Sequence, residues 1–192
     1  MPVYNYRLRR YHRLVTIYWD IDGEHSLPFI NTAKTIDPQK IDNHFGLFKT
    51  RKKAKEKLSQ LAKDHQLCEK LLGLETGKGK CFAYQLKRCR GACIGQESEM
   101  QHRIRLMQAL LPQRNQAWPY AGRIGIREIS TDREKTDIHL FDHWCYLGTI
   151  QHEIQLEQLK LFEDNNLMFD IDTYRILTSY LKKTKRPDII QL

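Results

Sequence analysis

The chain has 192 residues, of which 41% are hydrophobic, and a formal net charge of +9 at pH 7. That length is enough for one ordinary domain or two small ones. No stretch has the length and apolarity of a membrane span, and the basic start is not followed by the apolar run of a secretory signal. We therefore expect a soluble, cytoplasmic protein and exclude the membrane-spanning and secreted classes.

The positive charge is concentrated in the first part of the chain. Residues 1–114 contain 22 Lys and Arg against 11 Asp and Glu, a net charge of +11. Residues 115–192 contain 10 against 12, a net charge of −2. A basic region of this kind is typical of nucleic-acid binding, because cations that neutralise phosphates release condensed counterions. A membrane surface would also attract such charge, but no helix combines Lys and Arg with a Trp, Phe and Leu face.

The first predicted elements are a β-hairpin and a basic helix. Residues 14–19 are β-branched and aromatic, residues 20–23 form a turn, and residues 27–36 return as a second strand. Thr50 is the expected N-cap of a helix. Its apolar stripe would consist of Ala54, Leu58, Leu61, Ala62 and His65.

A second helix is predicted to begin at Ser98. Helical spacing of apolar residues assigns one buried stripe to this helix, and Pro112 ends it. That stripe would consist of Ile104, Met107, Leu110 and Leu111. The pair Trp118 and Pro119 marks a region boundary.

The last part of the chain mixes strands and helices. Residues 122–129 and 138–147 are predicted as strands around a polar turn, and residues 189–192 as a closing edge strand. Amphipathic helices are expected over residues 154–162 and 174–181. The predicted fold class is α+β, with an N-terminal β-hairpin, a small helical cysteine-rich module and a small α+β C-terminal region. Their boundaries are placed at residues 1–44, 45–114 and 115–192.

The cysteine spacing is the most specific pattern in the sequence. Cysteines lie at Cys68, Cys81, Cys89 and Cys93, a C-x12-C-x7-C-x3-C arrangement. Iron–sulfur clusters require thiolate ligands, and four thiolates complete a 4Fe-4S site. Zinc stays open, although structural zinc sites usually contain two short C-x2-4-C pairs. Four separate core cysteines are the plain alternative. We expect the nearby Lys87, Arg88 and Arg90 to lower the thiolate pKa values and to offset negative charge at the centre.

Two other groups of polar residues have structural explanations. Asp20 and Asp22 fit a turn before a glycine, and Asp170 and Asp172 stand where a helix needs an N-cap. A third group, His139, His143 and Cys145, would share one face of the predicted strand 138–147. A metal site there is possible, but ordinary strand histidines are the favoured interpretation.

Three segments resemble the UvrC/Cho excinuclease family. They are residues 45–50 (Phe-Gly-Leu-Phe-Lys-Thr), the basic helix after them, and residues 81–95 around the last three cysteines. The resemblance runs from Pro2 to about residue 128, and the remainder is similar to the tail of Cho-like proteins. It implies that the four cysteines hold a 4Fe-4S cluster, that double-stranded DNA is bound, and that UvrA- and UvrB-type repair proteins are partners.

The nuclease motifs of that family are missing from the printed sequence. In the family, a GIY-YIG domain supplies tyrosines, an arginine and a metal-binding glutamate before a Pro-x-Tyr-Asn segment. Residues 2–5 resemble that segment, so residues 1–44 would hold the end of such a domain, and only Asn5 could be an active-site remnant. A single asparagine cannot hold a catalytic metal. We therefore expect a split enzyme that needs a separate GIY-YIG chain, a DNA-binding accessory or a truncated remnant, and no catalysis by this chain alone. A metal-stabilised regulatory or interaction protein outside repair is the alternative.

The expected DNA contacts are the basic residues of three clusters. Each cluster could instead be a solvated surface, and the grouping of the charges favours DNA. The candidates are Arg7, Arg9, Arg10, Arg13, Lys49, Arg51, Lys52, Lys53, Lys55, Lys87, Arg88 and Arg90.

Overall fold

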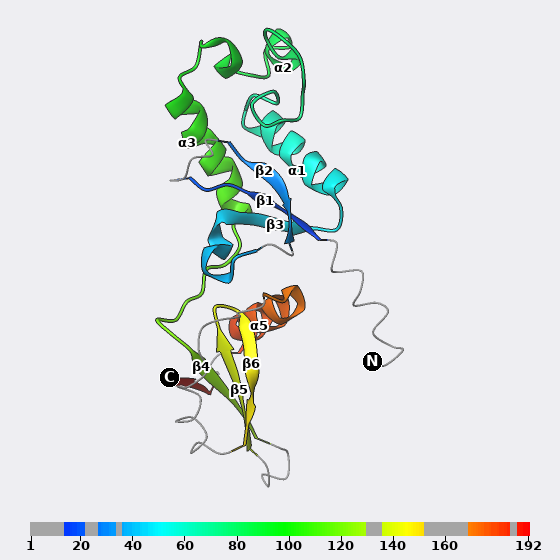
Figure 1. Cartoon of the computed structure of the whole chain (residues 1–192). Helices are drawn as coiled ribbons and strands as arrows, with labels where there is room; N and C mark the ends of the chain where they lie inside the picture. Colours follow the sequence, from blue (N-terminus) through cyan, green and yellow to red (C-terminus); the bar gives the residue numbers. More distant parts are fainter. Residues whose placement is uncertain (1–13, 22–26, 34–35, 130–135, 152–168, 185–187) are drawn as a thin grey trace. The chain divides into compact units, whose positions relative to one another are not determined.

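The residues that the structure describes form two units, each built around a small antiparallel sheet (Figure 1). The structure is a computed structural model of the chain. It describes residues 14–21, 27–33, 36–129, 136–151, 169–184 and 188–192. Unit 1 contains the described residues up to Ile36 together with Asp42–Asn115, and unit 2 contains Asp37–Ile41 and the described residues of Gln116–Leu192. The predicted α+β class is confirmed.

The sheet of unit 1 has three strands in the order β2-β1-β3. Strands β1 (Val15–Tyr18) and β2 (Phe29–Thr32) pair antiparallel, which confirms the predicted hairpin. Strand β3 (His44–Phe48) follows a 3-10 segment, Pro38–Asn43, and pairs with the other side of β1. The sequence did not predict this third strand, which directly precedes the basic helix and so sets where that helix starts.

Helix α1 (Arg51–Asp64) begins at the predicted cap. The Thr50 hydroxyl accepts the Lys53 backbone N–H at 3.2 Å, which satisfies one of the donors that a helix N-terminus leaves open. The buried residues of α1 are Ala54, Leu58, Leu61 and Ala62. His65, which was expected on the same stripe, is instead the exposed C-cap, because the helix ends at Asp64.

Helix α3 (Glu99–Leu110) buries a different face from the predicted one. The Ser98 hydroxyl caps it as expected, and a 3-10 turn over Leu111–Gln113 follows. The predicted stripe is wrong for three of its four members, since Ile104, Met107 and Leu111 are exposed. The buried residues of α3 are His102, Leu106, Ala109 and Leu110. The face that points inward is decided by the position of α1 and the sheet, and a histidine occupies it because its ring has a hydrogen-bond partner there.

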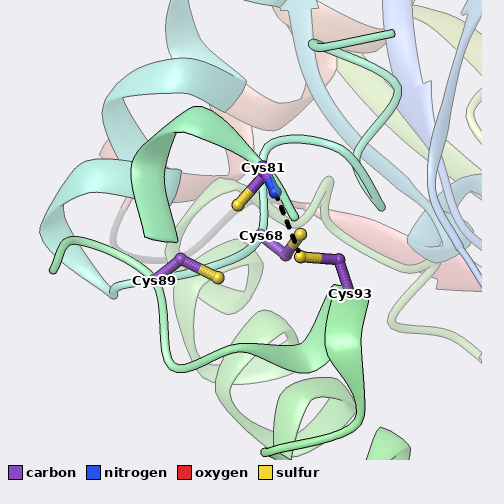
Figure 2. Close-up of side chains that lie close together, drawn as sticks. All are labelled: Cys68, Cys81, Cys89 and Cys93. Atoms are coloured by element: carbon purple, nitrogen blue, oxygen red, sulfur yellow. Dashed lines mark hydrogen bonds between the residues drawn. The ribbon is translucent and has the colours of Figure 1, made fainter. Parts of the chain in front are cut away.

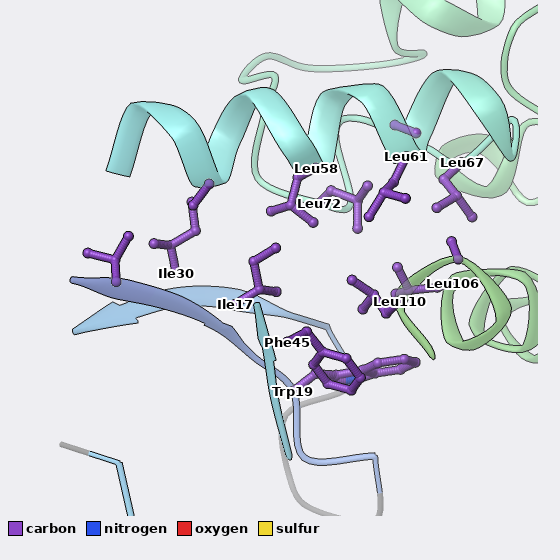
Figure 3. Packing of buried hydrophobic residues seen from close by; sticks show 14 residues of the cluster. Ile17, Trp19, Ile30, Phe45, Leu58, Leu61, Leu67, Leu72, Leu106 and Leu110 are labelled. Carbon is purple, nitrogen blue, oxygen red and sulfur yellow. The ribbon is translucent and has the colours of Figure 1, made fainter. Parts of the chain in front are cut away.

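One hydrophobic core joins the sheet, α1 and α3 of unit 1 (Figure 3). Ile17 and Trp19 from the hairpin are fully buried against Leu58 of α1 and Leu106 of α3. Full burial of an isoleucine or leucine side chain stabilises a fold by about 1.5–3 kcal/mol. Residues on both sides of the boundary drawn at 44 and 45 therefore share a single core, and this core carries the cysteine segment between α1 and α3.

The cysteine segment contains only short helical pieces. Helix α2 (Phe82–Gln85) is a single turn, and a 3-10 turn covers Ala92–Ile94. Gly91 and Gly95 flank the second piece with φ values of 84° and 75°, in the left-handed region. Glycine reaches this region without the steric cost that a Cβ brings, so the two glycines allow the chain to turn sharply around the last cysteine.

Unit 2 has a four-stranded sheet in the order β6-β5-β4-β7. Its strands are β4 (Ile124–Ile129), β5 (Thr136–Asp142), β6 (Cys145–Ile150) and β7 (Ile189–Gln191). The predicted edge strand at the end of the chain is confirmed as β7. The single strand predicted over residues 138–147 is wrong, because the chain turns at His143 and Trp144, whose φ values are 43° and 67°. Trp144 is fully buried, which favours this unusual turn.

Helix α5 (Ile171–Lys183) completes unit 2 and confirms the predicted second helix of this region. The carboxylate of Asp170 accepts the Thr173 backbone N–H at 2.8 Å, so the predicted N-cap role of this aspartate is confirmed. The helix expected over residues 154–162 lies outside the described residues. Of the helices in the described part of the chain, none combines the length and apolar character that crossing a bilayer would require.

Candidate metal centre

The four clustered cysteines converge on one point of unit 1 (Figure 2). The Sγ atoms of Cys68, Cys81, Cys89 and Cys93 all lie within 4.8 Å of one another. Three of the residues are buried and Cys93 is partly exposed. Among the described residues, no other group of His, Cys, Asp and Glu side chains has this geometry. Four sulfurs that face one another in this way suit a metal ion or cluster that binds through thiolates.

Each cysteine is positioned by a different local structure. Cys68 lies just after the C-terminal end of α1, and Cys81 is the N-cap residue of α2. Cys89 precedes the left-handed Gly91, and Cys93 lies in the 3-10 turn. Because α2 and the 3-10 turn bring the last three cysteines back toward the first, the site closes within one segment of the chain.

Backbone amides point at two of the sulfurs. The Cys81 N–H donates to the Cys93 Sγ at 3.4 Å, and the Gly91 N–H donates to the Cys89 Sγ at 3.3 Å. Hydrogen bonds of this kind stabilise negative charge on sulfur and tune metal–thiolate centres. The backbone is therefore already arranged for thiolate ligands.

Burial dominates the acidity of the thiols. It raises the pKa of Cys68 to about 11 and raises the pKa of Cys81 further. Burial also acts to raise the pKa of Cys93, but hydrogen bonds from the Cys81 backbone N–H and from neighbouring thiols outweigh it and lower that pKa. The expectation that Lys87, Arg88 and Arg90 lower the thiolate pKa values is wrong for Cys68 and Cys81, because desolvation is the larger effect. Metal binding must displace protons from these thiols.

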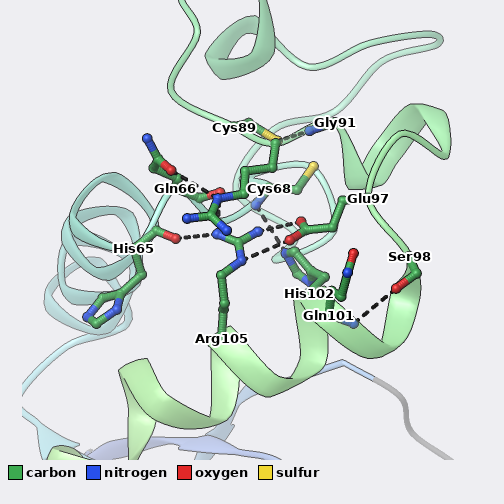
Figure 4. Close-up of polar contacts among 11 residues, drawn as sticks. His65, Gln66, Cys68, Cys89, Gly91, Glu97, Ser98, Gln101, His102 and Arg105 are labelled. Carbon is green, nitrogen blue, oxygen red and sulfur yellow. Dashed lines mark hydrogen bonds and ion pairs between the residues drawn. The ribbon is translucent and has the colours of Figure 1, made fainter.

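A polar frame that the sequence gave no reason to expect lies beside Cys68 (Figure 4). The Cys68 backbone N–H donates to Nε2 of His102 at 3.1 Å. Arg105 forms an ion pair with the buried carboxylate of Glu97 and donates to the carbonyl oxygen of Gln66 at 2.9 Å. The three residues of this frame (His102, Arg105 and Glu97) come from α3 and the loop before it, and only the fold places them beside Cys68.

The predicted DNA contacts on α1 lie on its exposed surface. Arg51, Lys52, Lys53 and Lys55 are exposed, and Lys49 is exposed just before the cap. The first turn of α1 contains no acidic residue. Cations at a helix N-terminus oppose the helix dipole, so this arrangement costs stability unless an anion is bound there. Lys53 also pairs with Glu56 at 2.7 Å, an exposed contact of small energy.

The structure describes only some of the remaining predicted DNA contacts. Lys87, Arg88 and Arg90 are exposed and lie between α2 and the 3-10 turn, inside the cysteine segment. Arg90 also donates to the Gln66 side chain at 3.0 Å. Asn5 and the arginine cluster Arg7, Arg9, Arg10 and Arg13 lie outside the described residues.

The histidines of unit 2 do not share one strand face. His139 lies on β5 and bonds to Thr149 at 2.7 Å and Glu128 at 3.0 Å, whereas His143 lies in the turn and bonds to Asp142 at 2.6 Å. The turn separates His143 from Cys145, so the geometry assumed for a metal site on one strand face is wrong. These hydrogen bonds give both histidine rings a structural role that needs no metal.

Comparison with known proteins identifies the family of this chain. The profile described as "UvrC/Cho excinuclease, middle domain" matches residues 16–111, which include the whole cysteine segment. The chain belongs to the UvrC/Cho excinuclease family. A second profile of the UvrC/Cho family, "Excinuclease Cho C-terminal domain", matches residues 123–192 and so covers most of unit 2.

Several curated proteins of the UvrC/Cho family are similar to this chain. Excinuclease Cho of Escherichia coli (strain K12) and that of Shigella flexneri are each 36% identical to it over 178 residues. Excinuclease Cho of Salmonella typhi is 35% identical over the same length. These matches cover 92% of the chain but only 57–58% of the relatives, so the chain spans somewhat more than half of their length. No solved structure matches it.

Proposed function

We propose that this chain is the cluster-binding and DNA-binding part of a UvrC/Cho-type nucleotide excision repair endonuclease. The observation that carries the proposal is the convergence of four cysteine sulfurs within 4.8 Å in a unit that matches the middle domain of that family. The four cysteines would hold a 4Fe-4S cluster, and the basic surface of unit 1 would bind double-stranded DNA.

The surroundings of the sulfurs support a thiolate-bound group. A 4Fe-4S cluster would crosslink four points of one loop and contribute to folding, as bound metals do in other small modules. The chain's own amides of Cys81 and Gly91 would stabilise the ligated sulfurs. Lys87, Arg88 and Arg90 would offset the negative charge of the centre from the exposed side of the loop.

One distance favours zinc as the second candidate. In a tetrahedral zinc site with Zn–S bonds of about 2.3 Å, the sulfurs lie about 3.8 Å apart. The separations of up to 4.8 Å are close to that geometry, whereas a cluster would have to hold the four thiolates farther apart. A zinc centre would leave a basic, metal-stabilised regulatory or interaction protein as the alternative function.

The DNA-binding role is supported by the charges of α1. Arg51, Lys52 and Lys53 occupy its first turn, where the helix dipole already favours an anion. Phosphate groups of a DNA backbone would satisfy both the cations and the helix N-terminus. Contacts of this kind position a protein on DNA without reading its sequence.

Incision requires groups that lie outside these 192 residues. The printed sequence contains no GIY-YIG motif set, and Asn5 alone cannot hold a catalytic metal. We assign strand cleavage to a GIY-YIG nuclease domain and damage location to UvrA- and UvrB-type proteins. Within that assembly, the present residues would bind and orient the DNA backbone.

Purification without oxygen followed by visible spectroscopy and iron, sulfide and zinc analysis tests the proposal. We expect a brown wild-type protein with iron and sulfide, lost in Cys89→Ser. Cys145→Ser is the matched control, because Cys145 is a buried cysteine of unit 2 that lies outside the cysteine cluster. A colourless protein with one bound zinc would support the alternative function, and a wild type that fails to bind duplex DNA would contradict the repair assignment.

A further inference from the structure

Arg105 lies at the centre of a set of contacts beside the cysteine segment (Figure 4). Its Nε and Nη2 atoms both donate to the carboxylate of Glu97, at 2.9 Å for the Nε contact. Its Nη1 atom donates to the backbone carbonyl oxygens of His65 and, at 2.9 Å, Gln66. A single guanidinium therefore connects one side chain to two backbone groups from another part of the chain.

These contacts hold both ends of the cysteine segment. His65 and Gln66 are the C-cap of α1 and the residue after it, directly before Leu67 and Cys68. Glu97 follows the last cysteine, Cys93, in the loop before α3. Arg105 thus joins the chain that enters the metal centre to the chain that leaves it.

The burial and geometry of the Arg105–Glu97 ion pair stabilise this connection. The Arg105 side chain is 13% exposed and that of Glu97 is 5% exposed, so each charge is largely removed from water and is compensated by the other. A planar guanidinium can bind a carboxylate through two nitrogens and still offer its third nitrogen to carbonyl oxygens, which a lysine cannot do. The His65 carbonyl stands at the C-terminal end of α1, which is the negative end of the helix dipole and favours a cation there.

We propose that Arg105, oriented by Glu97, is a positioning residue of the metal centre that keeps the cysteine segment arranged for ligation before metal binds. The inference rests on the proposed metal-binding function. It distinguishes this centre from metal modules that fold only when loaded, because the ends of the loop are held by protein groups alone. Loss of Arg105 should leave the four ligands in place and impair their geometry and metal affinity.

A second α3 arginine provides the control. Arg103 donates through Nη2 to the Ile21 carbonyl oxygen at 2.6 Å, a contact with the chain after β1 and not with the cysteine segment. Arg103→Gln and Arg105→Gln therefore remove the same charge and a similar arginine–carbonyl contact from the same helix. Only Arg105→Gln disconnects the ends of the cysteine segment. Glu97→Gln removes the other charge of the ion pair. Arg105→Lys keeps the positive charge but lacks the planar guanidinium that binds through several nitrogens.

The experiment is a Co²⁺ titration of the metal-free full chain and of each variant, followed by absorption and visible circular dichroism. We expect Arg105→Gln and Glu97→Gln to bind Co²⁺ about 10–100-fold more weakly than wild type, the usual effect of removing an outer-sphere partner of a metal site. Arg103→Gln should stay close to wild type, and Arg105→Lys should be intermediate. Per bound Co²⁺, the thiolate charge-transfer and ligand-field bands should change only in the Arg105 and Glu97 variants. General destabilisation would lower the bound fraction without changing those bands.

The outcomes separate this inference from the proposed function. If wild type binds Co²⁺ and Arg105→Gln matches Arg103→Gln in affinity and spectrum, the positioning role is refuted while the metal centre stands. If wild type takes up neither Co²⁺, iron nor zinc, the proposed function and the positioning role both fail. Should Arg105→Gln not fold, the same comparison between Glu97→Gln and Arg103→Gln decides the question.

Discussion

The backbone N–H of Cys68 donates to the ring nitrogen Nε2 of His102 at 3.1 Å, and both residues are buried. A buried amide without an acceptor costs about 1–3 kcal/mol. His102→Leu should therefore lower the free energy of unfolding of the metal-free chain by about that amount, measured by urea denaturation. His102→Gln, whose amide oxygen can accept a hydrogen bond, should lose less. Equal losses in the two variants would show that ring packing, not the hydrogen bond, is what His102 contributes.

The same hydrogen bond predicts a loss of stability in acid. Burial lowers the pKa of His102 below its ordinary 6.5, and the nearby Arg105 adds to this while Glu97 acts against it. Because a neutral ring is favoured in the folded state, this stabilisation is present above pH 6.5 and is lost as the pH falls through the lowered value. The stability advantage of wild type over His102→Gln, which has no titratable ring at this position, should shrink as the pH falls through this range. A wild-type advantage that stays constant in acid would contradict the prediction.

Two glycines beside the last cysteine should respond differently to alanine. Gly91 and Gly95 both have positive φ, so alanine is strained at each, by about 1 kcal/mol. At Gly91, an added Cβ would also lie 2.9 Å from the Gln96 Cβ and 3.0 Å from the Tyr84 ring, whereas nothing lies within 4 Å at Gly95. Gly91→Ala should therefore reduce thermal stability and metal content more than Gly95→Ala, and similar values for the two variants would argue against crowding at Gly91.

Local patterns predicted several elements because their determinants are local. Thr50, Ser98 and Asp170 each cap the helix that was expected to follow, since an N-cap depends on a side chain and an amide three residues apart. The hairpin of β1 and β2 likewise follows from alternating β-formers around a turn. The four cysteine sulfurs lie together, as the spacing of the cysteines in the sequence predicted.

Features that depend on distant partners were missed. The buried face of α3 includes His102 and Ala109, which carry little hydrophobic signal, while the more apolar Ile104 and Met107 are exposed. The two turn residues between β5 and β6 are His143 and Trp144, not the glycine or asparagine that usually marks a tight hairpin. Arg105 could not be linked to residues 65 and 66 from sequence alone, because about 40 positions separate them along the chain and only the shared core brings them together.

The basic turn of α1 predicts opposite effects on DNA binding and stability. Replacing Arg51, Lys52, Lys53 and Lys55 by alanine should weaken duplex DNA binding and reduce the salt dependence of log K by about 3, since each phosphate contact contributes about 0.9 and Lys53 is partly paired with Glu56. The same change removes repulsion with the helix dipole and should raise the melting temperature slightly.

The control for that experiment is Lys182→Ala combined with Lys183→Ala at the end of α5, where cations are favourable for the helix. This pair should leave the salt slope nearly unchanged. An α1 variant with a wild-type slope would remove that helix from the DNA interface, and one that binds weakly because it is unfolded would show a lowered melting temperature.

Alkaline pH should distinguish the metal-free chain from the loaded one. Burial raises the pKa of Cys68 from an ordinary 9.0 to about 11, so the protonated thiol is favoured in the folded metal-free chain. That contribution is complete below pH 9.0 and is lost as the pH rises through about 11, at a cost on the order of 1–3 kcal/mol. When metal holds Cys68 as a thiolate, no proton remains to be lost, and stability should not show this component. Urea denaturation between pH 8 and 11 of metal-free wild type, loaded wild type and metal-free Cys68→Ala measures it, because the last variant lacks the thiol. A metal-free wild type that follows the profile of Cys68→Ala would mean that Cys68 titrates as it does in the unfolded chain.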